Sequence, residues 1–169
     1  MSEVSVQKLK DFSLFKGLSE NELDRISKIV TTGEKEAGAT IISENEPGNE
    51  LYLLEDGVVD ILKTLTIVTS RNEFGTQERS FIRLTGENHC FFGDMVLFGK
   101  KERSATVKAV TRCQLFIIKD SDFLSLCEQE PRIGYIVLSN IALILSDYLR
   151  RANEDIIKLT TALSLALSG

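Results

Sequence analysis

Near the N-terminus, apolar residues recur at the three- and four-residue intervals of an amphipathic helix. This pattern predicts one helix over residues 4–12 and a second that begins at Ser19. Glu22 follows Ser19 at the spacing of a capping box, in which each residue bonds the other's backbone N–H. The apolar positions around this second helix are Leu18, Leu23, Ile26, Ile29 and Val30.

Between residues 33 and 119 the pattern changes to short apolar and β-branched runs separated by turn residues. Residues 46–49 and Gly57 mark tight turns. Residues 61–68 and 80–84 predict the two arms of a long hairpin around a tip at residues 72–75, and further strands follow over 106–110 and 113–118. Short strands at regular spacing predict a small barrel or sandwich.

The last third of the chain returns to helical spacing. We expect a short helix over residues 122–128, capped by Asp120 or Ser121, and a long final helix with Pro131 in its first turn. Eight apolar residues then alternate at intervals of three and four: Ala142, Leu145, Leu149, Ala152, Ile156, Leu159, Leu163 and Ala166.

This heptad stripe has two interpretations. It packs on its own barrel, at least in its first half, or it pairs with a second copy of the chain as in a coiled coil. We favour a homodimer, because the second half extends beyond the length that a barrel of this size covers. The chain is expected to form one domain, with N-terminal helices over 1–32, a barrel over 33–119 and C-terminal helices over 120–169.

Composition narrows the class of protein. The chain has 169 residues, of which 43% are hydrophobic and 27% charged, as is ordinary for a globular domain. The net charge of −5 argues against nucleic-acid binding by this chain alone, since such affinity rests on Lys and Arg. The most apolar window, residues 133–145, is interrupted by Ser139 and Asn140, so no membrane span is expected.

The cysteine and histidine residues predict neither a disulfide framework nor a catalytic or metal centre. Cys90, Cys113 and Cys127 are isolated, as suits a reducing cytosol, and no secretory signal opens the chain. His89 is the one histidine, and with Cys90 alone it makes a poor metal site. We therefore expect a cytoplasmic protein without a metal that is not an enzyme.

The most specific chemistry lies in residues 92–98 and in the arginine that follows them. Gly93 allows a close backbone approach to a ligand, and N–H groups after such a glycine can form an anion-binding nest. Arg103 supplies a planar fork of donors suited to phosphate. Asp94 can accept a hydrogen bond from a sugar hydroxyl. An acid for ribose and an arginine for phosphate is the polarity that a cyclic nucleotide requires.

This string closely resembles the phosphate-binding cassette of the cyclic nucleotide-binding domain family. The family pattern runs Phe-Gly-Glu, an apolar pair, a short loop, then Arg-Ser/Thr/Ala-Ala. Here residues 92–93 and 103–105 match it, whereas Asp94 stands in place of the glutamate. Asn45 stands where the family commonly has glycine, although asparagine tolerates a positive φ better than most residues.

The resemblance implies a fold and a set of ligand contacts. The fold is mainly β with flanking helices: a jelly-roll barrel (double-stranded β-helix) carrying the cassette at 92–106, N-terminal helices and a long C-terminal helix. The implied ligand-binding residues are Phe92, Gly93, Asp94, Met95, Val96, Arg103, Ser104 and Ala105. The residues expected to reach the purine are Arg150, Arg151, Asn153 and Glu154.

The implied function is a regulatory domain that binds cyclic AMP, with cyclic GMP as the second choice because Ser104 supplies a hydroxyl after the arginine. Because Asp94 is one methylene shorter than glutamate, binding is expected to be weaker by roughly 1.5–3 kcal/mol. The alternative is a ligand-free barrel that serves as a dimerisation or interaction module. No helix-turn-helix follows before Gly169, so the output is expected to lie in another, unidentified protein or in a longer chain.

Overall fold

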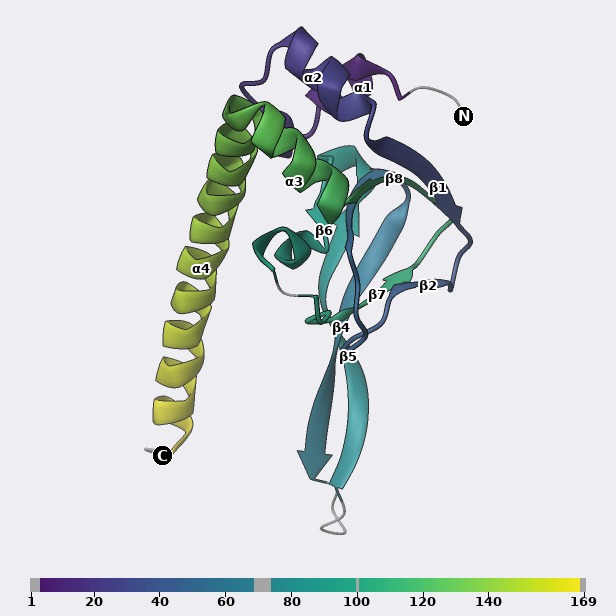
Figure 1. The fold of residues 1–169 in the computed structure, drawn as a ribbon. Coiled ribbons are helices and arrows are strands. Elements are labelled where there is room, and N and C mark those ends of the chain that lie inside the picture. The colour runs from purple at the N-terminus through teal and green to yellow at the C-terminus, as the bar shows by residue number, and fades with distance from the viewer. Residues whose placement is uncertain (1–3, 69–73, 100, 168–169) are drawn as a thin grey trace.

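The computed structural model describes residues 4–68, 74–99 and 101–167. Two four-stranded antiparallel sheets form the barrel, flanked by the N-terminal helices and a long C-terminal helix (Figure 1). One sheet has the order β1 (Val30–Lys35), β8 (Cys113–Lys119), β3 (Glu50–Asp56) and β6 (Phe91–Phe92). The other has the order β2 (Thr40–Ile42), β7 (Thr106–Ala109), β4 (Val58–Val68) and β5 (Phe74–Thr85). The predicted jelly-roll fold is confirmed.

The N-terminal elements are α1 (Val6–Lys10), the 3₁₀ turn η1 (Ser13–Phe15) and α2 (Glu20–Ser27). The predicted capping box is present, with the Ser19 N–H donating to Glu22 Oε2 at 2.7 Å and the Glu22 N–H donating to Ser19 Oγ at 3.4 Å. The first strand begins at Val30 and not at residue 33 as expected, because the β-branched run that starts there pairs with β8 from Val30↔Ile118 onward.

The predicted long hairpin is confirmed, and its arms are longer than expected. β4 and β5 pair from Val58↔Thr85 to Val68↔Phe74 and project from the barrel (Figure 1). Gly75, expected at the tip, therefore lies within β5. Asn72 and Glu73, also expected at the tip, lie outside the described residues.

Two turns show why their residues suit them. Asn45 has a φ of +66°, which confirms that asparagine takes the left-handed conformation where the family commonly has glycine. Gly57 has a φ of +97°, and a Cβ there would lie 2.5 Å from the Arg112 carbonyl oxygen. Gly57 therefore serves the barrel corner, as the sequence pattern indicates.

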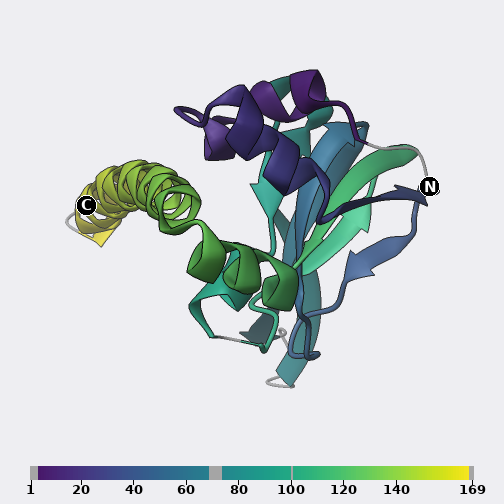
Figure 2. The ribbon, with the colours of Figure 1, turned by 45° about the horizontal axis from the view of Figure 1, so that its top comes forward.

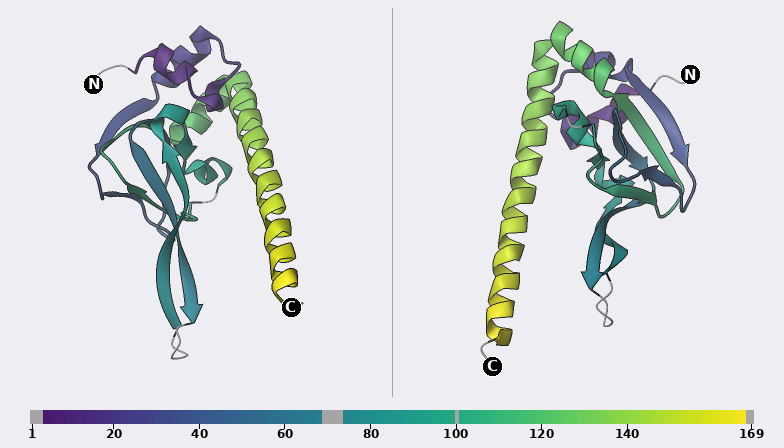
Figure 3. Two further views of the ribbon diagram at one scale, coloured as in Figure 1. Left: turned by 180° about the vertical axis from the view of Figure 1, so that it is seen from behind. Right: turned by 60° about the horizontal axis from the view of Figure 1, so that its bottom comes forward.

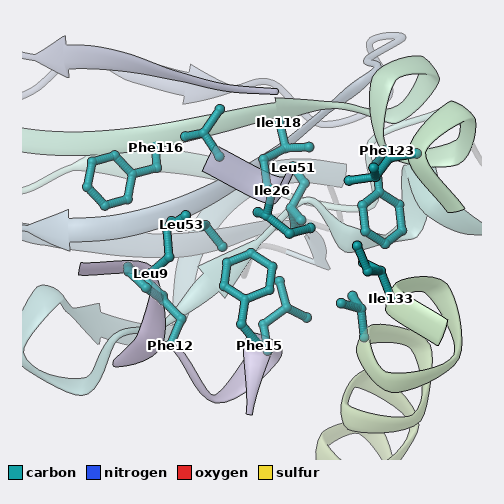
Figure 4. Packing of buried hydrophobic residues seen from close by; sticks show 14 of the residues in the cluster. Leu9, Phe12, Phe15, Ile26, Leu51, Leu53, Phe116, Ile118, Phe123 and Ile133 are labelled. Carbon is teal, nitrogen blue, oxygen red and sulfur yellow. The ribbon is translucent and has the colours of Figure 1, made fainter. Parts of the chain in front are cut away.

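A large apolar cluster joins the N-terminal helices, the first sheet and the start of the C-terminal helix (Figure 4). Phe12 and Phe15 pack with Leu51, Phe123 and Ile133, which are all buried. Full burial of such a side chain is worth about 1.5–3 kcal/mol. The cluster thus fixes the helical elements to the barrel.

Helix α3 (Asp120–Gln129) begins earlier than predicted. Its N-cap is Lys119, which makes no capping hydrogen bond through its side chain, so the expected caps Asp120 and Ser121 are wrong. The physical reason is that β8 runs directly into the helix, which places both residues inside its first turn. Helix α4 (Pro131–Leu167) begins at Pro131 as predicted.

The two halves of α4 differ in their surroundings. In the first half Ile133, Val137 and Ile141 are buried, and Asn140 Nδ2 donates to the carbonyl oxygens of Leu14 at 2.9 Å and Lys16 at 2.8 Å. The second half extends away from the barrel, toward the same end of the molecule as the β4–β5 hairpin (Figure 3). Figure 2, which views α4 nearly along its axis, shows the helix to one side of the sheets. All eight heptad residues are exposed, so the packing on the barrel uses a different stripe of the helix.

By length and composition alone, α4 is long and apolar enough to cross a membrane, in contrast to the prediction made from residues 133–145. An 18-residue window reaches a mean hydropathy of 1.3, with 22% of its residues buried in the protein. A mostly buried core helix meets the same criterion, and in α4 the buried side chains lie in the first half of the helix.

Candidate functional site

A cavity of about 400 Å³ lies between the second sheet, the cassette and α4, a volume within the range of small-molecule sites. β4, β5 and β7 contribute an apolar wall made by Ile61, Ile82, Leu84 and Val107. The eight ligand-binding residues that the resemblance implied all line this cavity: Phe92, Gly93, Asp94, Met95, Val96, Arg103, Ser104 and Ala105. The expected ligand-binding set is therefore brought together in one place.

Arg103 is held by its backbone on both sides. Its carbonyl oxygen accepts from the Asn45 N–H at 2.9 Å, and its N–H donates to the Glu46 carbonyl oxygen at 3.0 Å. The Gly48 N–H adds a bond to the Lys101 carbonyl oxygen at 2.8 Å, and Pro47 pairs with Glu102. The turn over residues 45–48 thus pairs with residues 101–103 as a strand would, and this pairing fixes the backbone position of Arg103.

The guanidinium of Arg103 is buried, with 8% of the residue exposed. Its Nη1 atom donates to the Gly93 carbonyl oxygen at 3.3 Å, and its Cζ atom lies 5.8 Å from the centre of the Tyr52 ring. Among the described residues, no carboxylate lies within salt-bridge distance of it. A buried cation without a carboxylate is costly to keep unless an anion joins it.

Two glycines leave room for this guanidinium. A Cβ at Gly48 would lie 2.0 Å from Arg103 Nε, and a Cβ at Gly93 would lie 2.8 Å from Arg103 Nη1. Gly93 also has a φ of +80°, which L side chains rarely adopt. The sequence pattern indicated only a turn at Gly48, because its contact with Arg103 depends on the three-dimensional fold.

Tyr52 supports the arginine from the first sheet. Its ring stacks on Phe92 with centroids 5.3 Å apart, and its hydroxyl donates to Glu50 Oε2 at 2.5 Å. Burial, together with the neighbouring Glu50, raises the pKa of the Tyr52 phenol, while Arg103 opposes the shift. Tyr52 therefore stays neutral beneath the cation.

Asp94 is the first residue of the 3₁₀ turn η3 (Asp94–Phe98) and faces the same cavity. Burial raises the pKa of its carboxyl, and a hydrogen bond from its own backbone N–H opposes that shift. This carboxylate is removed from solvent and has few hydrogen-bond partners in the protein, so it can accept a hydrogen bond from a ligand's hydroxyl.

Helix α4 closes the cavity with Ile144, Leu145 and Tyr148. Tyr148 lines the cavity together with the cassette residues. Partial burial raises the pKa of its phenol, Cys90 and Asp94 raise it further, and Arg151 opposes the shift. Ile144 and Tyr148 follow the buried Ile141 at helical spacing, with Ile144 partly buried and Tyr148 53% exposed. That spacing was a signal for these residues, but the prediction used the heptad stripe instead.

The four residues expected at the purine lie further along α4 than Tyr148, the last residue of this wall. Arg150, Arg151, Asn153 and Glu154 are exposed on α4 and are not among the cavity-lining residues. Arg150 instead pairs along the helix with Glu154 at 2.9 Å and Asp147 at 3.5 Å. Their contact with a ligand stays a prediction that needs a movement of the helix.

His89 and Cys90 also line the cavity. The ring of His89 packs edge-on against Phe12 with centroids 5.2 Å apart, and burial raises the pKa of the Cys90 thiol. Within the described part of the chain, no group of three His, Cys, Asp or Glu residues is placed to hold a metal. These two residues shape the cavity next to the N-terminal helices.

Residues 33–130 match the model of a family described as the cyclic nucleotide-binding domain. The chain belongs to the cyclic nucleotide-binding domain family. The match contains the barrel, the cassette and α3, so the family resemblance given by residues 92–105 extends over more than half of the chain.

Relatives carry this domain in different contexts. The chain is 30% identical to the cyclic AMP receptor protein of Thermus thermophilus over 88% of this chain and 62% of that protein. It is 29% identical to a cyclic nucleotide-gated potassium channel of Mesorhizobium japonicum over 73% of this chain and 30% of the channel. The chain thus spans less than two thirds of the length of these curated relatives.

A solved structure of the Thermus thermophilus catabolite activator protein shows the same fold. It superposes with a TM-score of 0.70 at 29% identity, covering 88% of this chain and 63% of that one. Most of this chain therefore shares its fold with that protein.

Proposed function

We propose that this chain is a regulatory sensor that binds cyclic AMP in the 400 Å³ cavity and reports its occupancy through α4. The observation that carries the proposal is Arg103, a buried guanidinium that lines the cavity and has no carboxylate partner among the described residues. A phosphate supplies the missing anion and accepts a bidentate hydrogen bond from the guanidinium.

The cavity has the polarity of the proposed ligand. Arg103, Ser104 and the backbone of Ala105 form one polar end, where the cyclic phosphate binds. Asp94 accepts a hydrogen bond from the ribose 2′-hydroxyl. The apolar strand residues and Tyr148 enclose the purine, for which cyclic GMP is the competing ligand.

The same cavity couples the ligand to α4. Ile144, Leu145 and Tyr148 contribute to the cavity wall, so a ligand that contacts them favours one position of the helix over another. A ligand shifts such an equilibrium only by its differential affinity for the two arrangements. We expect a coupling of about 1–3 kcal/mol, as in typical allosteric proteins.

We further propose that the exposed heptad stripe of α4 pairs with a second copy of the chain. Leu149, Leu159 and Leu163 are each about three-fifths exposed or more, and the stripe repeats at the spacing of a coiled coil. Leu159→Glu should convert a dimer to a monomer in analytical ultracentrifugation, whereas Thr161→Glu, off the stripe, should leave the dimer intact. A wild-type monomer at high concentration would contradict this part.

The cellular setting follows from the same proposal. The chain acts in the cytoplasm, where its three free thiols stay reduced and where cyclic nucleotides are made. It signals by binding, not by catalysing a reaction, and passes the signal to an output protein or segment that remains to be identified.

Isothermal titration with cyclic AMP and cyclic GMP tests the proposal. We expect saturable binding to the wild type and a loss of affinity of about 100-fold or more for Arg103→Gln, since two charge-assisted hydrogen bonds disappear. Arg112→Gln is the matched control, because Arg112 is exposed and paired with Glu34 and Glu36 away from the cavity. Absence of binding to the wild type up to millimolar ligand would support a ligand-free module instead.

A further inference from the structure

Beside the cassette, outside the cavity wall, lies a charged pair that the sequence patterns did not indicate. Lys63 Nζ on β4 lies 2.7 Å from Glu44 Oε1 in the segment after β2. The same ammonium group donates to the Ser104 carbonyl oxygen at 2.7 Å. Lys63 therefore joins the barrel to the residue that directly follows the buried arginine.

Glu44 is itself held at several points. Its Oε2 atom accepts from the Thr64 N–H at 3.1 Å, and its own N–H donates to Thr106 Oγ1 at 3.0 Å. Its side chain is only 10% exposed, and the hydrogen bond from Lys63 is the main reason why its pKa lies below the usual range. Glu44 thus fixes the ammonium group of Lys63 in one place.

The contact matters because the strand-like pairing of the cassette with residues 45–48 ends at Arg103. The backbone bonds of that pairing use the N–H and the carbonyl of Arg103 and stop there. Among the described residues, no group of the chain accepts from the N–H of Ser104 or Ala105. In the part of the chain that the structure describes, the bond from Lys63 is the hydrogen bond made to the peptide between these two residues.

Because the peptide group is planar, the bond to the Ser104 carbonyl also determines the direction of the next N–H group. In a trans peptide the carbonyl and the following N–H point to opposite sides. A carbonyl of Ser104 that is directed to Lys63 therefore directs the Ala105 N–H away from Lys63. Ser104 and Ala105 both line the cavity, whereas Lys63 is not among its lining residues.

We propose that Lys63 and Glu44 form a positioning pair that sets the Ser104–Ala105 peptide so that the Ala105 N–H faces the cavity as a donor to the ligand's phosphate. This rests on the proposed function, because the donor has a purpose only when an anion binds. Lys63 acts through the peptide and not as a free charge near the phosphate, since Glu44 neutralises it at 2.7 Å.

Titration of variants with cyclic AMP tests the pair. Lys63→Met should weaken binding about tenfold, Lys63→Arg should stay within about threefold, and Glu44→Gln should fall between them. Lys28→Met is the matched control, because Lys28 forms a 2.7 Å pair with Asp24 on α2 and is similarly exposed. The melting temperatures of all four variants should lie within a few degrees of the wild type, because both lysines are about half exposed and Glu44→Gln keeps the size of the side chain.

The two phosphorothioate diastereomers of cyclic AMP separate positioning from a general loss of structure. If one phosphate oxygen receives the Ala105 N–H, Lys63→Met should cost less with the diastereomer whose sulfur replaces that oxygen. An equal loss for cyclic AMP and both diastereomers would overturn the proposal, as would wild-type affinity in Lys63→Met.

A ligand-free readout keeps this inference distinct from the function. If the wild type binds no cyclic nucleotide, the proposed function fails, and ligand-free crystal structures of the wild type and Lys63→Met then decide the inference. A rotated Ser104–Ala105 peptide in the variant supports the positioning role. An unchanged peptide overturns it.

Discussion

The cavity has two walls that are built in different ways. The cassette wall is fixed from several sides: the turn over 45–48 pairs with Arg103, two glycines shape the space for its guanidinium, and Tyr52 lies beneath it. The α4 wall consists of three side chains on one helix, and all three lie beyond Ile141, the last buried residue of that helix. One wall is held by many contacts before any ligand binds, whereas the other has few, and we propose that this second wall moves when a ligand fills the cavity.

This difference assigns separate tasks to the two walls. A preorganised wall contributes affinity, because little ordering remains to be done when the ligand binds. A wall carried by a helix with few anchors contributes coupling, because its position is a balance between two arrangements. Substitutions in the first wall should therefore change affinity for every cyclic nucleotide, and those in the second should change selectivity and response.

The largest expected effect is that of Gly48→Ala. Its Cβ would lie 2.0 Å from Arg103 Nε, and the buried guanidinium must leave its place to accept it. We expect cyclic AMP and cyclic GMP to lose affinity alike, by about 100-fold, as in Arg103→Gln. When Gly48→Ala is added to Arg103→Gln, affinity should not fall further. A second loss of about 100-fold in the double variant would contradict the account.

Gly33→Ala is the control for this prediction. A Cβ there would lie 2.8 Å from Ile117 Cδ1, the end of a flexible side chain away from the cavity wall made by the cassette. Isothermal titration should give wild-type affinity for this variant.

The next effect concerns the acid of the cassette wall. Because burial raises the pKa of Asp94, its carboxylate begins to take up a proton at a higher pH than an exposed aspartate does. The ribose hydroxyl needs the ionised form as its acceptor, so affinity should fall as the pH is lowered through this raised pKa, by up to about tenfold. Titrations from pH 7 downward measure the slope.

Asp94→Asn is the control for the pH dependence. It keeps an acceptor oxygen and removes the titration, so its affinity should be lower at pH 7 and flat below it. An unchanged slope in this variant would assign the dependence to another group.

A smaller effect is expected at the helix wall. Tyr148→Ala removes an aromatic ring that lines the cavity, and we expect affinity to fall by about three- to tenfold. The ratio of cyclic AMP to cyclic GMP affinity should change at the same time, which Gly48→Ala should leave unaltered. Tyr148→Phe keeps the ring, so its affinity should stay close to that of the wild type. If Tyr148→Ala weakened cyclic AMP and cyclic GMP binding equally, the distinction between the two walls would be contradicted.

The smallest effect concerns stability without a ligand. Arg103 is the one charged residue that is buried among the described part of the chain, and its neighbours offer a carbonyl and a ring but no carboxylate. Replacing a buried charge by an apolar group of similar length is often neutral or stabilising. Arg103→Met should therefore shift the unfolding free energy by less than about 1 kcal/mol in urea, while it abolishes binding. A large destabilisation would indicate a structural role for this arginine.

The sequence predicted the barrel, the capping box of α2 and the start of α4 because each rests on local spacing and turn residues. It also predicted which cassette residues gather at the cavity, since they lie close together in the chain. It did not predict Gly48, Tyr52 or Lys63, whose roles depend on contacts between strands distant in sequence. On α4 the prediction relied on the heptad stripe and therefore missed Ile144 and Tyr148, which follow Ile141 at helical spacing and line the cavity.

A crystal structure of the chain with cyclic AMP tests the central claim most directly. The account predicts the cyclic phosphate at the Arg103 guanidinium, the ribose hydroxyl at Asp94 and the purine between the strand wall and Tyr148, with α4 displaced more than the cassette. A ligand bound elsewhere, or a cavity that stays empty at millimolar cyclic AMP, would contradict it.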